Sequence, residues 1–161
     1  MANKITTEKE AIAAVEEDYS EFVRVPDKLK TAELCLAAVQ GDGLLLDCVP
    51  VGLKTEKLCL AAVKSDGPAL KFVPEKLKTV ELCLAAVKNT GFAFRFVPEK
   101  LKTVELCLAI VKQNGLVLEN LPEELLTMEV CLAAVKKNSS AIKYVPKKMQ
   151  AQVKEALKKK K

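Results

Sequence analysis

The residues with the most obvious reactivity are six cysteines, and five of them recur at intervals of 24 residues: Cys35, Cys59, Cys83, Cys107 and Cys131. Thiols in such a series could bind a metal, form disulfides or relay electrons. The chain has no C-x-x-C pair and no histidine, so the usual zinc ligand sets are missing. If the repeats are helical, their axes lie about 8–10 Å apart, whereas a disulfide needs Cα atoms within about 7 Å. The spacing therefore predicts five buried core thiols, with no metal and no cofactor.

The sixth cysteine, Cys48, lies in a position that holds Phe72, Phe96, Asn120 and Tyr144 in other copies. This variation predicts a partly exposed thiol, but no catalytic partner accompanies it. Hydrolase motifs such as G-x-S-x-G are absent, and the glycines of 41–43 are better explained as a helix stop than as a phosphate loop. Because histidine, the commonest general base, is also absent, the sequence favours a protein that is not an enzyme.

Lysines recur in two series, one preceding and one ending the main repeated segment. The first series is Lys30, Lys54, Lys78 and Lys102, and the second is Lys64, Lys88, Lys112 and Lys136. A basic stripe of this kind could follow a phosphate backbone. Repeated glutamates lie near both series, for example Glu81 and Glu105. Solvated, self-compensating faces are therefore the default interpretation.

The net charge of the chain, +5 from 26 Lys and Arg against 21 Asp and Glu, is concentrated at its C-terminal end. Residues 1–144 sum to −1, whereas residues 145–161 carry seven Lys and one Glu. One hypothesis is therefore a binder of an anionic partner, either nucleic acid or an acidic membrane surface. Its residues would be Lys147, Lys148, Lys154, Lys158, Lys159, Lys160 and Lys161. A polar cap that keeps the end of a repeat array soluble explains the same charge without a ligand.

An uninterrupted 24-residue repeat organises the whole sequence. Val-Pro begins at residues 25, 49, 73, 97 and 145, and Leu121-Pro122 fills the remaining place. We predict a single repeat domain over 1–161. It comprises an N-terminal capping unit (1–24), five regular units (25–144) and a C-terminal capping helix with a Lys-rich tail (145–161).

Each unit combines a main helix with a shorter helical element. In residues 79–88, Thr79 is a candidate N-cap, Glu81 and Lys88 suit the two ends of the helix dipole, and Gly91 suggests a left-handed stop. The wheel of this helix places an apolar arc around Cys83, formed by Leu82, Leu84, Ala86 and Val87. A short helix with so wide an apolar face must pack on its copies. The expected fold is an all-α, superhelical α-solenoid in which the second element is α or 3₁₀.

The repeat pattern E-L-C-L-A-A-V-K-x-x-G-x-A-x-x-x-V-P-E-K-L-K-T resembles an uncharacterised bacterial tandem-repeat family, a domain of unknown function. The architecture is also similar to that of the leucine-rich repeat variant, whose units alternate α and 3₁₀ helices in a right-handed superhelix. The resemblance implies a fold and no activity. The first copy departs from the pattern at Ala11, and the tail departs from it after Met149, as expected of capping segments.

Three positions of the second element change in kind between copies while the scaffold positions stay nearly constant. The predicted partner-binding residues among them are Lys71, Phe72, Arg95, Phe96, Lys143 and Tyr144. A constant scaffold with variable surface chemistry is typical of a solenoid that binds another protein. The alternative is that these aromatics cover the core side of the short element. The hypothesis is a non-enzymatic scaffold for protein–protein interaction, with no small-molecule substrate and no disulfide-linked partner.

The start of the chain and its cysteines favour a cytoplasmic protein. Residues 1–8 lack the apolar run of a signal peptide, and apolar stretches such as 106–111 are far shorter than the roughly 20 residues that span a bilayer. Six cysteines without a secretory signal are typical of a reducing compartment.

Overall fold

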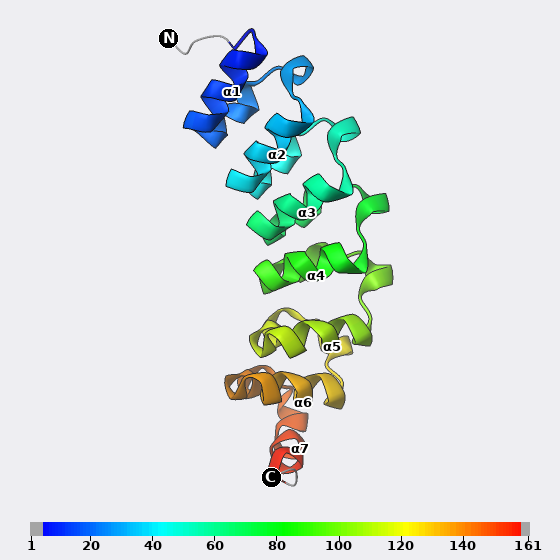
Figure 1. Ribbon diagram of the computed structural model, residues 1–161. Helices are drawn as coiled ribbons and strands as arrows, with labels where there is room; N and C mark the ends of the chain where they lie inside the picture. The colour runs from blue at the N-terminus through cyan, green and yellow to red at the C-terminus, as the bar shows by residue number, and fades with distance from the viewer. Residues whose placement is uncertain (1–4, 159–161) are drawn as a thin grey trace. The chain divides into compact units, whose positions relative to one another are not determined.

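The computed structural model describes residues 5–158, and these residues form helices and turns without a β-strand (Figure 1). Six ten-residue α-helices recur with the 24-residue period: α1 (Glu8–Glu17), α2 (Ala32–Gly41), α3 (Glu56–Ser65), α4 (Val80–Asn89), α5 (Val104–Gln113) and α6 (Met128–Lys137). A twelve-residue helix, α7 (Lys147–Lys158), follows them. The prediction of an all-α solenoid of tandem 24-residue units is confirmed.

Two 3₁₀-helices separate consecutive α-helices from α1 to α6, and one separates α6 from α7. The six-residue series is η1 (Tyr19–Arg24), η3 (Gly43–Cys48), η5 (Gly67–Phe72), η7 (Gly91–Phe96), η9 (Gly115–Asn120) and η11 (Ser139–Tyr144). The three-residue series is η2 (Asp27–Leu29), η4 (Val51–Leu53), η6 (Glu75–Leu77), η8 (Glu99–Leu101) and η10 (Glu123–Leu125). The second element of the repeat is therefore 3₁₀, and the turn after Val-Pro contains a further 3₁₀ turn that the sequence did not reveal.

A threonine starts every ten-residue helix, as predicted at Thr79. In α4 the Thr79 Oγ1 accepts a hydrogen bond of 3.2 Å from the Leu82 amide, and the same bond recurs at Thr103 with Leu106. At the first copy, the N-cap Thr7 and Glu10 form a full capping box. Each threonine satisfies an amide that the helix itself leaves without a partner.

The glycines that follow the helices do not act as left-handed stops, so that prediction is wrong. No described residue has a positive φ. The helices end instead in extended residues, such as Asp42 after α2 and Asp66 after α3. A Cβ placed on Gly43 would lie 2.2 Å from the Ala62 carbonyl oxygen of the next copy. The glycine is needed because two backbones approach closely.

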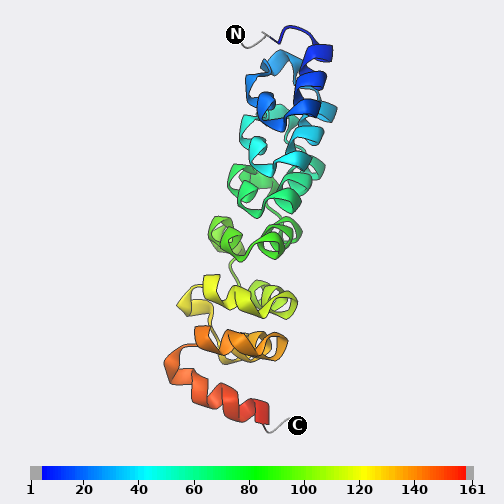
Figure 2. The same ribbon diagram turned by 90° about the vertical axis from the view of Figure 1, so that its left-hand side faces the viewer.

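The described residues fall into two compact units, one ending at Thr90 and the other beginning at Gly91. In the first unit, α1 to α4 lie side by side in chain order, and η1, η3 and η5 form a second row (Figure 2). In the second unit, α5 packs on α6, α6 packs on α7, and η7, η9 and η11 form the corresponding row. The core of each unit lies between its two rows.

The core side of each regular α-helix consists of four positions. In α3 these are Leu58, Cys59, Ala62 and Val63, all buried. The predicted apolar arc is correct at the matching residues of α4, except that Leu84 is only half-buried. Ala11 replaces the cysteine in α1 and is fully buried.

Candidate functional site

The surface of the six-residue 3₁₀-helices carries the residues that vary most between copies. The first variable position of these elements is open to solvent in several units, with Leu44 43%, Phe92 47% and Leu116 37% exposed. The second position, which includes Lys71, Arg95 and Lys143, is exposed in every copy from Asp47 onward. We use the name 3₁₀ ridge for the six predicted residues at these positions: Lys71 and Phe72 in the first compact unit, and Arg95, Phe96, Lys143 and Tyr144 in the second.

Each aromatic side chain of the 3₁₀ ridge is half-buried and carries a cation over its ring. The Lys71 Nζ lies 4.3 Å from the centroid of the Phe72 ring, and the Lys143 Nζ lies 4.7 Å from that of Tyr144. The Arg95 guanidinium lies 4.8 Å from the Phe92 ring. Placed in this way, the cation and the ring together form one amphipathic surface.

The second ring beside Arg95 is Phe96, at 5.5 Å from the guanidinium. The Phe92 and Phe96 rings meet edge to face at 6.0 Å. At the end of η11, the Tyr144 side chain and the Glu119 carboxylate raise the pKa of the Lys143 ammonium, the tyrosine more strongly. Lys143 is therefore a cation across the physiological pH range.

The alternative explanation of Phe72 and Phe96 is that they cover the core side of the short elements. Other residues supply that core side. In η5 the buried side chains are Ala69 and Leu70, and in η7 they are Ala93 and Phe94. Phe72 and Phe96 lie outside these sets and are only half-buried. Both rings therefore keep part of their surface exposed.

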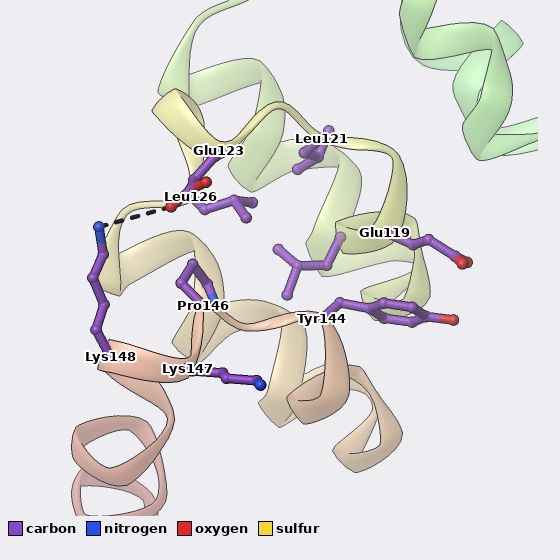
Figure 3. A pocket seen from close by; sticks show the side chains of 9 residues that line it. Glu119, Leu121, Glu123, Leu126, Tyr144, Pro146, Lys147 and Lys148 are labelled. Carbon is purple, nitrogen blue, oxygen red and sulfur yellow. Dashed lines mark ion pairs between the residues drawn. The ribbon is translucent and has the colours of Figure 1, made fainter.

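A pocket of about 500 Å³ lies between η9, η10 and the start of α7 (Figure 3). Leu118, Leu121, Leu126 and Pro146 supply its apolar lining. Its polar lining is Glu119, Glu123, Tyr144, Lys147 and Lys148. The fold thus brings together one candidate of the 3₁₀ ridge, Tyr144, and two candidates of the anion-binding tail, Lys147 and Lys148.

The described lysines of the tail are Lys147, Lys148, Lys154 and Lys158, and all four are exposed on α7. Lys148 forms an ion pair with Glu123 at 3.7 Å, with both side chains about three-quarters exposed. Lys159, Lys160 and Lys161 lie outside the described residues.

The lysine series in the turn is not a solvated face, and that interpretation is wrong. The Lys30 side chain is only 6% exposed, and its Nζ donates to the Cys48 carbonyl at 2.7 Å and to Asp27 at 2.9 Å. Lys78 is 8% exposed and Lys102 16%. The sequence signal was the acid three residues before the lysine, as at Asp27. The series at the helix ends is exposed as expected.

The five repeated cysteines are fully buried free thiols, which confirms the core interpretation. Burial raises the pKa of the Cys83 thiol and that of Cys107 to about 11, so both stay protonated near neutral pH. Cys48 is partly exposed, as its variable position predicted. Over residues 5–158, His, Cys, Asp and Glu side chains form no group of three or more that could hold a metal ion.

Among the described helices, none combines the length and the apolar character needed to cross a membrane.

These observations define the class as a helical-repeat protein with a buried constant scaffold and a variable outer row. A family model for a domain of unknown function, DUF4116, matches residues 55–102 and 103–150 in two adjacent segments. The chain belongs to this family. Each matched segment spans two of the 24-residue units. No curated protein matches the chain, and no solved structure matches it.

Proposed function

We propose that this chain is a non-enzymatic scaffold that binds another protein along the 3₁₀ ridge. The observation that carries the proposal is the repeated pairing of an exposed cation with a half-buried aromatic ring in η5, η7 and η11. Aromatic and arginine side chains are enriched among residues that dominate binding energy at protein interfaces. A ring that already contacts a cation loses less side-chain entropy on binding than a ring that is free to rotate.

The variability of the same surface supports a specific partner. The neighbouring core positions are nearly identical between copies, whereas the position that supplies the cations of the 3₁₀ ridge changes from Asp47 to Lys71, Arg95, Glu119 and Lys143 along the chain. A partner that contacts this position in several copies would therefore meet negative charge at Asp47 and Glu119 and positive charge at Lys71, Arg95 and Lys143. The order of these exposed charges can favour one alignment of the partner along the repeats over the others.

The test is an affinity pull-down with the full chain and a triple variant, Phe72→Ala, Phe96→Ala and Tyr144→Ala. We expect the variant to keep its helical circular dichroism and to lose the partner that the wild type captures, because all three aromatic anchors are removed. A matched triple variant, Lys64→Ala, Lys88→Ala and Lys136→Ala, changes exposed residues of the long helices. It should retain the partner. A folded ridge variant that keeps every partner would contradict the proposal.

A second candidate function is binding of an anionic partner through the basic C-terminal segment. Its support is the exposure of Lys147, Lys148, Lys154 and Lys158 on one helix. Nucleic acid or an acidic membrane surface would be the ligand. Such binding weakens steeply with added salt, since each phosphate contact releases counterions. It should also vanish when residues 147–161 are deleted, and binding that survives both changes would exclude it.

We also propose a cytoplasmic location. The support is five buried free thiols in a fold that does not use them as disulfides.

A further inference from the structure

A recurrent cradle for an ammonium group lies between consecutive units. At Lys30 the cradle consists of the Asp27 carboxylate three residues earlier, the Cys48 carbonyl eighteen residues later, and the Phe22 ring eight residues earlier. Their distances from the Lys30 Nζ are 2.9 Å, 2.7 Å and 5.0 Å to the ring centroid. The ammonium is therefore compensated by a charge and a carbonyl while its stem is buried.

Parts of this cradle recur around the corresponding lysine in the next three copies. The Lys54 Nζ donates to the Phe72 carbonyl at 3.3 Å. The Nζ of Lys78 donates to Glu75 at 2.6 Å. In the second compact unit, the Lys102 Nζ donates to Glu99 at 2.6 Å and lies 5.8 Å from the Phe94 ring centroid. In all four copies the cation comes from the same position of the repeat.

The fifth copy keeps the acid and the backbone carbonyl position of the cradle, has a leucine in place of the ring, and supplies no cation from the lysine position. Leu126 stands where the earlier copies have lysine, while Glu123 stands three residues before it and Tyr144 eighteen residues after it. Leu118, at the position of Phe22 and Phe94, is buried. These four residues line the 500 Å³ pocket. Figure 3 shows Leu126 beside Glu123, whose carboxylate faces Lys148, while the Tyr144 ring points away from them toward Glu119.

We propose that this pocket binds the side chain of a lysine from a partner protein. The apolar stem lies against Leu118, Leu126 and Pro146, and the ammonium is held by the Glu123 carboxylate and the Tyr144 carbonyl. The inference rests on the proposed function because the lysine comes from a protein, and because Tyr144 belongs to the 3₁₀ ridge. Lysine is favoured over arginine since all four internal occupants of the cradle are lysines.

Lys148 occupies part of this site in the free protein. Its Nζ lies 3.7 Å from Glu123, but the two side chains are 76% and 74% exposed. An exposed pair of this kind is weak. The partner's lysine therefore displaces Lys148 from Glu123, and removing Lys148 strengthens binding.

The experiment is a methyl NMR titration of the full chain with a small probe, Nα-acetyl-lysine methylamide. The neutral comparison is Nα-acetyl-norleucine methylamide, which keeps most of the apolar stem. We expect the lysine probe to shift the methyl signals of Leu118 and Leu126, and to bind roughly 3–5-fold more tightly than the norleucine probe. Equal affinity for both probes would reduce the site to an apolar pocket and overturn the inference. Tighter binding of Nα-acetyl-arginine methylamide would overturn the choice of lysine.

Three variants and one control separate this site from general effects. Leu126→Lys places a tethered ammonium in the cradle, at an effective concentration of millimolar or more, and should abolish probe binding. Glu123→Gln should weaken it about 2–5-fold, and this exposed change tests the site even if the first variant fails to fold. Glu99→Gln, in the unit whose cradle Lys102 already fills, should leave probe binding unchanged. Lys148→Ala should tighten it.

Wild-type affinity in Glu123→Gln, or in a folded Leu126→Lys, would overturn the inference. Because the probe is a free amino-acid derivative, its binding does not depend on the pull-down partner. If the lysine probe does not bind but the pull-down still depends on the three ridge aromatics, the lysine site is rejected and the proposed function stands. Probe binding without ridge-dependent capture rejects the ridge and retains a lysine site.

Discussion

Gly43 and Gly52 lie nine residues apart, and their surroundings differ completely. The space that a Cβ would take at Gly43 is filled by the Ala62 carbonyl and the Asp66 amide of the next copy, whereas nothing lies within 4 Å of such an atom at Gly52. Neither glycine has a positive φ. The requirement for glycine at position 43 is therefore steric and arises between copies.

The substitution Gly43→Ala should lower the free energy of unfolding by about 2–3 kcal/mol, because backbone must move to admit the methyl group. Gly52→Ala is the matched control. It should leave stability unchanged or raise it by up to about 1 kcal/mol, since alanine restricts the unfolded chain. Chemical denaturation with both variants measures the difference. Equal effects at the two sites would refute the packing explanation.

The buried cysteines predict a distinct pattern of thiol reactivity. Near pH 7.5 the native chain should expose about one reactive thiol to an aromatic disulfide reagent, because only Cys48 is partly exposed and burial raises the pKa of the thiols in the core. All six thiols should react in guanidinium chloride. The variant Cys48→Ala should show almost no native reactivity. Fast reaction of several thiols in the folded chain would contradict the core assignment.

The same thiols make stability dependent on alkaline pH. The pKa of Cys83 is about 11 in the folded chain, against an ordinary value of 9.0. Above pH 9 the unfolded chain therefore loses the proton first, and stability falls as the pH rises toward 11. The midpoint of urea denaturation should drop across this window. The double variant Cys83→Ala and Cys107→Ala should show a smaller drop, and an equal drop would assign the effect to other groups.

At the scale of the element, each ten-residue helix is too short to be stable alone, so its ends and its neighbours decide whether it forms. The threonine caps satisfy the first turn, and extended residues such as Asp66 and Asn114 end each helix and begin the next 3₁₀ element. Asn89 connects α4 to the preceding copy, since its side chain bonds the Lys64 and Ser65 carbonyls and the Gly67 amide. The end of α4 and the end of α3 therefore stabilise each other through the Asn89 side chain.

Removal of one cap should have a measurable cost. Thr79→Ala deletes the acceptor for the Leu82 amide and should destabilise the chain by about 1 kcal/mol. Thr79→Ser keeps the oxygen and should recover most of that loss. Thermal or urea denaturation of the two variants gives the comparison. If serine were as destabilising as alanine, the contribution of Thr79 would come from its methyl group.

At the scale of the whole molecule, the terminal copies differ from the inner ones in how much they bury. Helix α1 buries only Ala11 and Val15, whereas α2 and α3 each bury four side chains. Helix α7 buries Val153 alone. The positive charge of α7 lies on an outer face, so the basic character of the chain belongs to its end and not to its core.

Amide hydrogen exchange should therefore be faster in α1 than in α2 and α3, because fewer buried contacts oppose its local opening. The measurement is exchange followed by mass spectrometry on peptides from the three helices. The peptides of α2 and α3 serve as internal controls because both are flanked by neighbouring copies. Protection of α1 equal to that of α3 would show that the first copy is a full structural unit.

The sequence by itself determined the repeat, the helix starts and the buried stripe, because these depend on local spacing and on the period of a single helix. Thr79, Cys83 and Val87 could each be assigned from their neighbours along the chain. The exposure of the 3₁₀ ridge also followed, since the variation from Asp47 to Lys143 has few packing constraints.

Only the tertiary structure decided what lies between copies. The burial of Lys30 depends on a carbonyl eighteen residues later, and the role of Gly43 depends on a carbonyl from the next helix. The pocket at Leu126 likewise combines residues from two consecutive 24-residue copies and from the start of α7, all within the second compact unit. Such contacts join atoms that no local period brings together, so they appear only when the copies are packed and their backbones meet.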